Sequence, residues 1–228
     1  MIKGGFMKRA ATALVILALT TGTAAAASQC PAGYSVQHSI EPHSETAFGP
    51  ESGQGAGGCS VQMRNGFPVP DPNCTPGAFN PTITLEILQD PKFRTGCIRD
   101  KATTPQEKSQ TYSWYDIKHP SNNQGATQVY ELDHFVPLEL GGADTLDNIW
   151  PQCGPSRVAL ANRYFKQKDL VENYLASMVR ANKADLDQAR KCITADWTQF
   201  LDQARAVCHG TRCEVSEEQN LDLTGCGG

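Results

Sequence analysis

The chain of 228 residues lacks the features that mark several protein classes. Only 19% of its residues are charged, 7% are aromatic, and no internal repeat is present. Its apolar run over 10–19 is shorter than the ~20 residues that a membrane-spanning helix needs. These absences exclude a collagen, a coiled-coil rod, a multi-span membrane protein and a highly charged disordered chain. The remaining length is enough to bury one hydrophobic core.

The first 27 residues have the pattern of a secretory signal peptide. Three cations precede the apolar run, and small residues then lead to an Ala-x-Ala cleavage site after Ala27. Removing 1–27 changes the formal net charge from −4 to −7, with 17 basic residues against 24 acidic ones. The sequence therefore predicts a secreted or periplasmic protein that has no membrane attachment once the signal is cleaved.

Nine cysteines are present, and no two of them form a C-x-x-C pair, which weighs against a four-cysteine zinc site. In an exported protein they indicate a disulfide framework. The odd number leaves at least one thiol unpaired within the chain or bonded to another molecule, so the oligomeric state stays open. The sequence does not choose a connectivity among Cys30, Cys59, Cys74, Cys97, Cys153, Cys192, Cys208, Cys213 and Cys226.

The chain divides by composition. Residues 28–70 form a Gly-, Ser- and Pro-rich N-terminal arm with little periodicity. After residue 70 come turn residues, a short strand or helix start, and a helix capped near Thr103 or Thr104. The spacing of apolar residues predicts helices over 158–181 and 185–207. The tail 208–228 carries three cysteines, and we expect it to fold back through disulfides.

The residues that can carry chemistry lie between 128 and 150. Residues 128–134 alternate as in a strand, and this strand ends in Asp133-His134. Gly141-Gly142 predicts a tight turn, and Asn148 follows fourteen residues after His134. The helix predicted over 158–181 comes next.

This arrangement resembles the HNH endonucleases, whose ββα-metal (His-Me) finger carries Asp-His, Pro, Gly-Gly and Asn in this order. The resemblance covers about 131–180 for the finger. It extends over about 71–201 for a secreted bacterial branch of the family, on the runs DPNCTPGAFNP, TGCIRD and KQKDLVENYL. It implies an α+β fold in which a ββα-metal finger is embedded in a disulfide-stapled nuclease domain over 71–207, with C-terminal helices.

Phosphodiester hydrolysis needs a base that activates water and a cation that absorbs charge. His134 is the natural base, because imidazole is the side chain that changes charge near neutral pH. Asp133 would hold a divalent metal ion, with Mg²⁺ or Mn²⁺ favoured over Zn²⁺. Asn148 would fix the local loop and the orientation of the imidazole. Adjacent strand residues point to opposite faces, so Asp133 and His134 share a side only if the strand ends or twists there.

The second metal ligand departs from the family pattern. The family usually supplies a His or an Asn from the finger helix, whereas this chain has Arg157 there and no His between His134 and His209. Lys168 and Glu172 lie on an otherwise apolar stripe of the helix, so Glu172 is a candidate metal ligand and Lys168 a candidate phosphate contact. The alternative is an i,i+4 ion pair between the two.

A basic cluster on and before the same helix contains no acidic residue between its ends. We expect it to contact the phosphates of a nucleic acid, although such a cluster can also be a solvated face. Its members are Arg157, Arg163, Lys166 and Lys168.

The sequence thus predicts a metal-dependent endonuclease of the secreted type, acting on nucleic acid without strong sequence preference, with DNA favoured over RNA. The formal charge of −7 argues against a broad basic binding surface. The alternative is a non-catalytic, exported, disulfide-rich binding or scaffold protein that retains the finger, since a fold does not fix a function.

Overall fold

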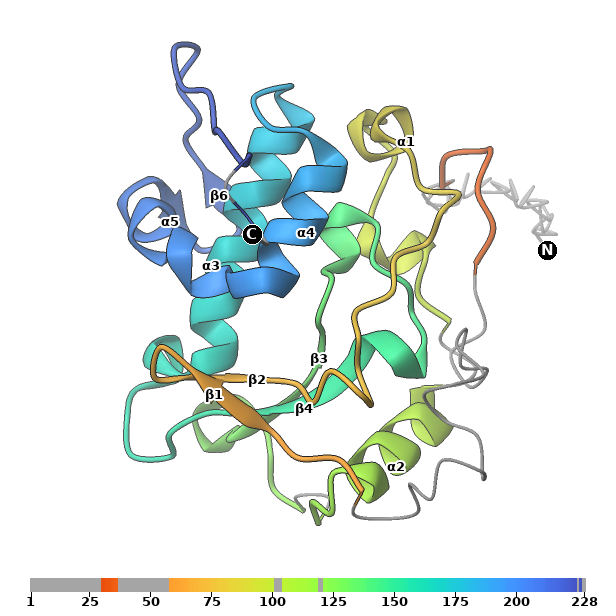
Figure 1. Cartoon of the computed structure of the whole chain (residues 1–228), viewed down its shortest axis with the longest axis vertical. Coiled ribbons are helices and arrows are strands. Elements are labelled where there is room, and N and C mark those ends of the chain that lie inside the picture. Colours follow the sequence, from red (N-terminus) through yellow and green to blue (C-terminus); the bar gives the residue numbers. More distant parts are fainter. Residues whose placement is uncertain (1–29, 37–57, 101–103, 119–120, 225, 227–228) are drawn as a thin grey trace, which may run out of the picture.

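A computed structural model describes residues 30–36, 58–100, 104–118, 121–224 and 226 of the chain (Figure 1). The predicted signal peptide over 1–27 lies outside the described residues, as does most of the N-terminal arm.

Helices and small antiparallel sheets are mixed along the chain, which confirms the α+β expectation at this level. The described residues form the α-helices α1 (Leu85–Gln89), α2 (Thr104–Trp114), α3 (Tyr164–Arg180), α4 (Leu186–Asp196) and α5 (Leu201–Val207). Their strands pair into two-stranded sheets, which are β1 (Gln62–Arg64) with β2 (Phe67–Val69), β3 (Tyr130–His134) with β4 (Ile149–Cys153), and β5 (Cys208–His209) with β6 (Arg212–Cys213).

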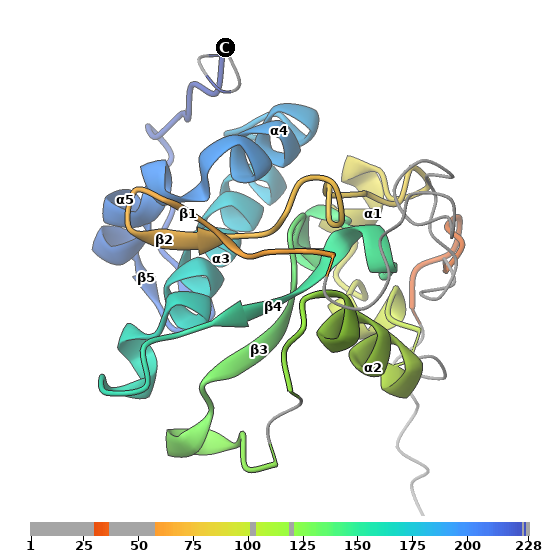
Figure 2. The ribbon, with the colours of Figure 1, turned by 60° about the horizontal axis from the view of Figure 1, so that its bottom comes forward.

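The β3–β4 ribbon runs between two helical parts of the molecule (Figures 1 and 2). Helix α3 packs against both strands on one side, and α2 contacts β4 on the other. Helices α4 and α5 pack on α3 away from the ribbon. The ribbon is therefore covered by helices, and its charged side chains need partners within the protein.

The N-terminal arm contains a hairpin that its composition did not predict. Strands β1 and β2 pair in antiparallel register through Asn65-Gly66, whose φ angles are 51° and 80°. Two positive φ angles in a two-residue loop are typical of a type I′ turn, and Asn-Gly is its preferred sequence. Phe67 then packs edge-on against Trp197, with ring centroids 5.0 Å apart. The hairpin therefore connects the end of the segment 28–70 to the hydrophobic core.

Helix α3 is shorter than the predicted helix over 158–181. Residues 160–162 form a single 3₁₀ turn, and Arg163 has extended backbone angles of −74° and 150°, so the α-helix begins at Tyr164. At the other end Asn182 adopts a φ of 57°, and the amide of Lys183 donates to the Met178 carbonyl oxygen. A left-handed residue with this backward bond terminates the helix.

The predicted helix over 185–207 is two helices. Asp185 caps α4, because its side chain accepts a hydrogen bond from the Gln188 amide at 2.8 Å. Asp196 then leaves the helical region, with φ of −162° and ψ of 95°, and its side chain accepts from the amide of Thr198 at 2.9 Å. This second cap starts a short 3₁₀ turn at Trp197 and breaks the helix, although the apolar spacing continues through it.

The hydrophobic core lies around α3, α4 and α5. Its fully buried members from these helices are Val171, Leu175, Met178, Val179, Ala189, Cys192, Ile193 and Ala204. Among the residues that the structure describes, no helix is long and apolar enough to cross a membrane.

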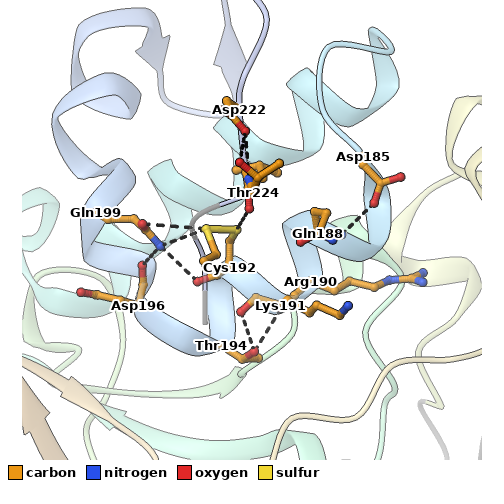
Figure 3. Close-up of a disulfide and its surroundings, with 12 residues drawn as sticks. Asp185, Gln188, Arg190, Lys191, Cys192, Thr194, Asp196, Gln199, Asp222 and Thr224 are labelled. Atoms are coloured by element: carbon orange, nitrogen blue, oxygen red, sulfur yellow. Dashed lines mark hydrogen bonds between the residues drawn. A yellow bond between two sulfur atoms is a disulfide. The ribbon is translucent and has the colours of Figure 1, made fainter. Parts of the chain in front are cut away.

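Four disulfides confirm the predicted framework. They join Cys30 to Cys97, Cys59 to Cys74, Cys192 to Cys226 and Cys208 to Cys213, and Cys153 is a free thiol. Figure 3 shows how Cys192 on α4 holds the C-terminal tail next to Gln199. The tail therefore folds back through disulfides, as the sequence predicted.

Candidate functional site

Asp133 and His134 end β3, where the ribbon meets α3 and the loop over 135–148. The register pairs Asp133 with Trp150 and His134 with Ile149. Both residues are 7% exposed, and as neighbours on a strand their side chains point in opposite directions. Asp133 faces Lys168 of α3, whereas His134 faces Asp144 of the loop. The strand therefore does not twist enough to give the two side chains a common partner.

The loop over 135–148 is held by Asn148, which is fully buried. Its amide nitrogen donates to the carbonyl oxygens of Val136 (2.9 Å) and Ala143 (2.8 Å), and its oxygen accepts from the Val136 amide (2.8 Å). These bonds agree with the expectation that Asn148 fixes the local loop. The imidazole of His134, however, is hydrogen-bonded to Asp144 and not to Asn148.

The predicted Gly-Gly turn is sterically required at this place. Gly141 has a φ of 75°, in the left-handed region that favours glycine. A Cβ atom on Gly142 would lie 1.8 Å from the Val136 carbonyl oxygen. The turn brings Asp144 back to His134, so the two glycines shape the surroundings of the imidazole.

The His134–Asp144 pair is the feature of this site with the clearest chemical consequence. His134 Nε2 lies 2.7 Å from Asp144 Oδ1, and the other oxygen of Asp144 accepts from the Asp100 amide at 2.5 Å. Burial alone would raise the pKa of Asp144, but the hydrogen bond and charge of His134, together with the Asp100 amide and the charge of Arg99, hold that pKa below its ordinary value. A carboxylate that accepts the Nε2 proton leaves Nδ1 as the free acceptor of a neutral imidazole.

Lys168 forms a second charged group on the opposite side of β3. Its Nζ donates to the His134 carbonyl oxygen at 2.8 Å, lies 3.0 Å from Asp133 Oδ2, and is hydrogen-bonded to Glu172 Oε1. The side chain is 0% exposed. Burial alone would lower the pKa of Lys168, but the charges of Asp133 and Glu172 raise it, so the ammonium stays charged. The ion pair that the i,i+4 spacing suggested is therefore present.

The donor set proposed for a metal ion does not fit one in this arrangement. Asp133 and Glu172 are the two carboxylates that the sequence suggested as ligands, and both contact the Lys168 ammonium instead. Within the described ranges, no three His, Cys, Asp or Glu side chains gather in a group that could hold a metal ion. A divalent ion at this place would have to displace a buried lysine.

The predicted basic cluster is not one exposed surface. Arg157 is exposed, but Arg163 is 4% exposed and donates to the Ala126 carbonyl oxygen at 2.8 Å. Lys166 is paired with Glu131 at 3.2 Å and with Asp169 at 2.7 Å, and Lys168 is buried. The cations were close in sequence, but the turn before α3 and the helical rotation direct them to different partners.

Asp144 is the residue that sequence reasoning missed. It lies between the Gly-Gly turn and Asn148, in a loop without periodicity, so no local pattern identified it. The sequence did offer one indication. The Gly-Gly turn directs the following segment back toward the end of β3, and this segment contains the acidic residue Asp144.

Comparison of the chain with known protein families, characterised proteins and solved structures finds no match.

Proposed function

We propose that this chain is an exported hydrolase of phosphodiester bonds in nucleic acid, with His134 as its general base. The observation that carries the proposal is the contact between His134 Nε2 and Asp144, which leaves Nδ1 as the basic nitrogen. The order Asp133-His134, Gly141-Gly142 and Asn148, with its resemblance to the HNH finger, supports the choice of substrate. A ββα-metal type finger made of β3, β4 and α3 is part of this proposal.

The proposed step begins with a water molecule at Nδ1. His134 takes a proton from the water as its oxygen attacks phosphorus, and the bond from phosphorus to the leaving oxygen breaks. The leaving oxygen takes a proton from solvent, and His134 returns its own proton to solvent afterwards. Asp144 keeps the ring in the required tautomer and stabilises the imidazolium that forms. Positioned bases of this kind contribute ~10²–10⁴-fold to a rate.

Substrate binding rests on few cations in this proposal. Arg157 is the exposed member of the predicted cluster, whereas Arg163, Lys166 and Lys168 are engaged within the protein. Low affinity is therefore expected. The affinity should depend only weakly on salt, because the slope of log affinity against log salt grows with the number of phosphates that the protein neutralises. DNA remains favoured over RNA as the substrate.

The four disulfides support an oxidising compartment, secreted or periplasmic, as the place of action. Oxidised, processed protein should then degrade plasmid DNA. Cleavage is measured in Mg²⁺, in Mn²⁺ and in EDTA. The comparison shows whether the protein cleaves DNA and whether the cleavage needs a divalent ion. No cleavage in any arm would reject the proposed function.

The second candidate is a non-catalytic exported binding or scaffold protein. The specific observation that favours it is the pairing of Asp133 and Glu172 with Lys168, which is the arrangement of a structural ion pair. Absence of cleavage from folded, oxidised protein in all three arms is the outcome that this candidate predicts.

A further inference from the structure

Three oxygens of different origin converge on one buried atom. The Nζ of Lys168 contacts the Asp133 and Glu172 carboxylates and the His134 carbonyl oxygen. Carboxylate and backbone carbonyl oxygens are the ligands that hard divalent cations prefer. The same set also matches the three donors of an ammonium group. An ammonium group or a divalent ion could therefore be bound by these three oxygens. Distances and burial decide whether a metal ion could replace the Lys168 ammonium.

Distance and burial favour the ammonium. The contacts of 2.8 and 3.0 Å are hydrogen-bond lengths, longer than the ~2.0–2.6 Å of Mg²⁺ or Ca²⁺ to oxygen. Lys168 is 0% exposed and is held on α3 one turn before Glu172, so its side chain has no solvent to move into. Withdrawing it would leave either a buried charge without a partner or a displaced helix, and both are costly.

We infer that Lys168 takes the place of a divalent metal ion in this chain, as a covalently attached cation that contacts Asp133 and Glu172 and fixes the His134 peptide. Lys168 is thus a positioning residue for His134: its bond to the His134 carbonyl oxygen ties α3 to the last residue of β3. The Lys168 ammonium thus occupies the place that a divalent metal ion from solution would otherwise take.

The inference has a consequence that does not depend on catalysis. Wild-type protein should bind no divalent ion at Asp133 and Glu172, so millimolar Mn²⁺ or EDTA should leave its melting temperature unchanged. Lys168→Ala removes the ammonium but keeps the three oxygens, so this variant should melt lower than the wild type. Millimolar Mn²⁺ should then raise its melting temperature by about 5 °C or more, since a ligand that binds only the folded state stabilises it.

Two controls assign that effect to the site. The double variant Lys168→Ala/Asp133→Asn should lose the Mn²⁺ response, because one of the three ligands is gone. Lys166→Ala changes the neighbouring lysine, which also contacts two carboxylates but is 32% exposed, and it should gain no response. A folded Lys168→Ala variant without a Mn²⁺ response overturns the inference.

Where Lys168→Ala does not fold, the wild type still decides. The inference is overturned if stoichiometric Mn²⁺ raises the melting temperature of the wild type and if this rise is absent in the Asp133→Asn variant. The absence of a Mn²⁺ effect on the wild type supports the inference. The variant Lys168→Met/Glu172→Gln replaces the pair by neutral side chains of similar size, and it should then fold and show no change in melting temperature with Mn²⁺.

Activity gives a separate arm, which rests on the proposed function. Cleavage by the wild type should be the same in EDTA as in Mg²⁺. Cleavage that EDTA abolishes would overturn the inference about Lys168 while leaving the proposed function in place. Absence of cleavage under every condition would reject the proposed function, and the binding measurements would still test the inference.

Discussion

The two sides of β3 bury ionisable groups to the same extent but leave them in different chemical states. Asp133 and His134 are each 7% exposed. On the α3 side, the Lys168 ammonium donates to the His134 carbonyl oxygen and the Glu172 carboxylate, and it forms an ion pair with Asp133. On the loop side, only one of the two imidazole nitrogens of His134 is hydrogen-bonded within the part of the chain that the structure describes.

The difference separates a structural role from a reactive one. The buried contacts of Lys168 with Asp133, Glu172 and the His134 peptide hold α3 to the ribbon. A carboxylate–imidazole pair with a free nitrogen keeps one site for a proton. Equal burial therefore does not imply an equal role, and the partner of each group decides what it can do.

The largest effect on stability is expected from the α3 side. Lys168→Ala leaves Asp133 and Glu172 buried without their cation, and breaking a buried pair in this way costs about 3–5 kcal/mol. Urea denaturation at neutral pH measures the loss in the free energy of unfolding. A loss below about 1 kcal/mol would show that Lys168 is not the counter-ion of the two carboxylates.

On the loop side, Asn148→Ala should cost about 2–4 kcal/mol, because it removes three hydrogen bonds and leaves buried backbone groups of Val136 and Ala143 without partners. The matched control is Asn173→Ala on α3, where the side chain makes one bond, to the Asp169 carbonyl oxygen. Equal losses for the two variants, by the same urea measurement, would contradict the role of Asn148 in holding the loop.

The two sides should respond to acid with opposite sign. The lowered pKa of Asp144 means that its contribution to stability is present above the ordinary value of 3.8 and is lost as the pH falls through the lower folded value. Burial, together with nearby carboxylates, raises the pKa of Glu172 well above 4.5 despite the charge of Lys168. Its folded form therefore binds a proton more tightly, and stability rises as the pH falls toward 4.5.

Two variants isolate these contributions in urea denaturation between pH 3 and 7. In the wild type, the free energy of unfolding should fall with acid below about pH 4 through Asp144, and Asp144→Asn should reduce this fall. Between neutral pH and 4.5 it should rise with acid through Glu172, and Glu172→Gln should reduce this rise. The sign of each change in slope, relative to the wild type, is the quantity to compare. The difference in the free energy of unfolding between each variant and the wild type should change with pH in opposite directions for the two variants. A change in the same direction would contradict the assignment of partners on the two sides.

The smallest effect is expected from the exposed pair next to Lys168. Lys166→Ala breaks contacts with Glu131 and Asp169, but the three side chains are about one-third exposed, so solvent screens them. The expected cost is below about 1 kcal/mol. A cost comparable with that of Lys168→Ala would mean that burial does not distinguish the two lysines.

The predictability of these two sides from sequence differs for a physical reason. The strand, the Gly-Gly turn, Asn148 and the polar pair on α3 all have short-range patterns, and the structure contains them. The contact of Lys168 with Asp133 joins residues 35 positions apart, and the contact of His134 with Asp144 depends on the path of a loop without periodicity. Local pattern does not specify such contacts.

The same limit explains the errors in the fold. The apolar spacing continues through Asp196, so the break between α4 and α5 was hidden by a side chain that caps a new turn. Four disulfides were expected, but their connectivity depends on which cysteines the fold brings together. The hairpin at Asn65-Gly66 was detectable, because its turn signal is local, and the composition of the surrounding arm obscured it.

The most direct test of the account is the rate of plasmid cleavage in EDTA by oxidised wild-type protein and by His134→Ala. Circular dichroism and the melting temperature confirm that the variant is folded. The account predicts that the wild type cleaves DNA in EDTA and that His134→Ala loses ~10²–10⁴-fold in rate. A folded His134→Ala variant that cleaves at the wild-type rate would contradict it.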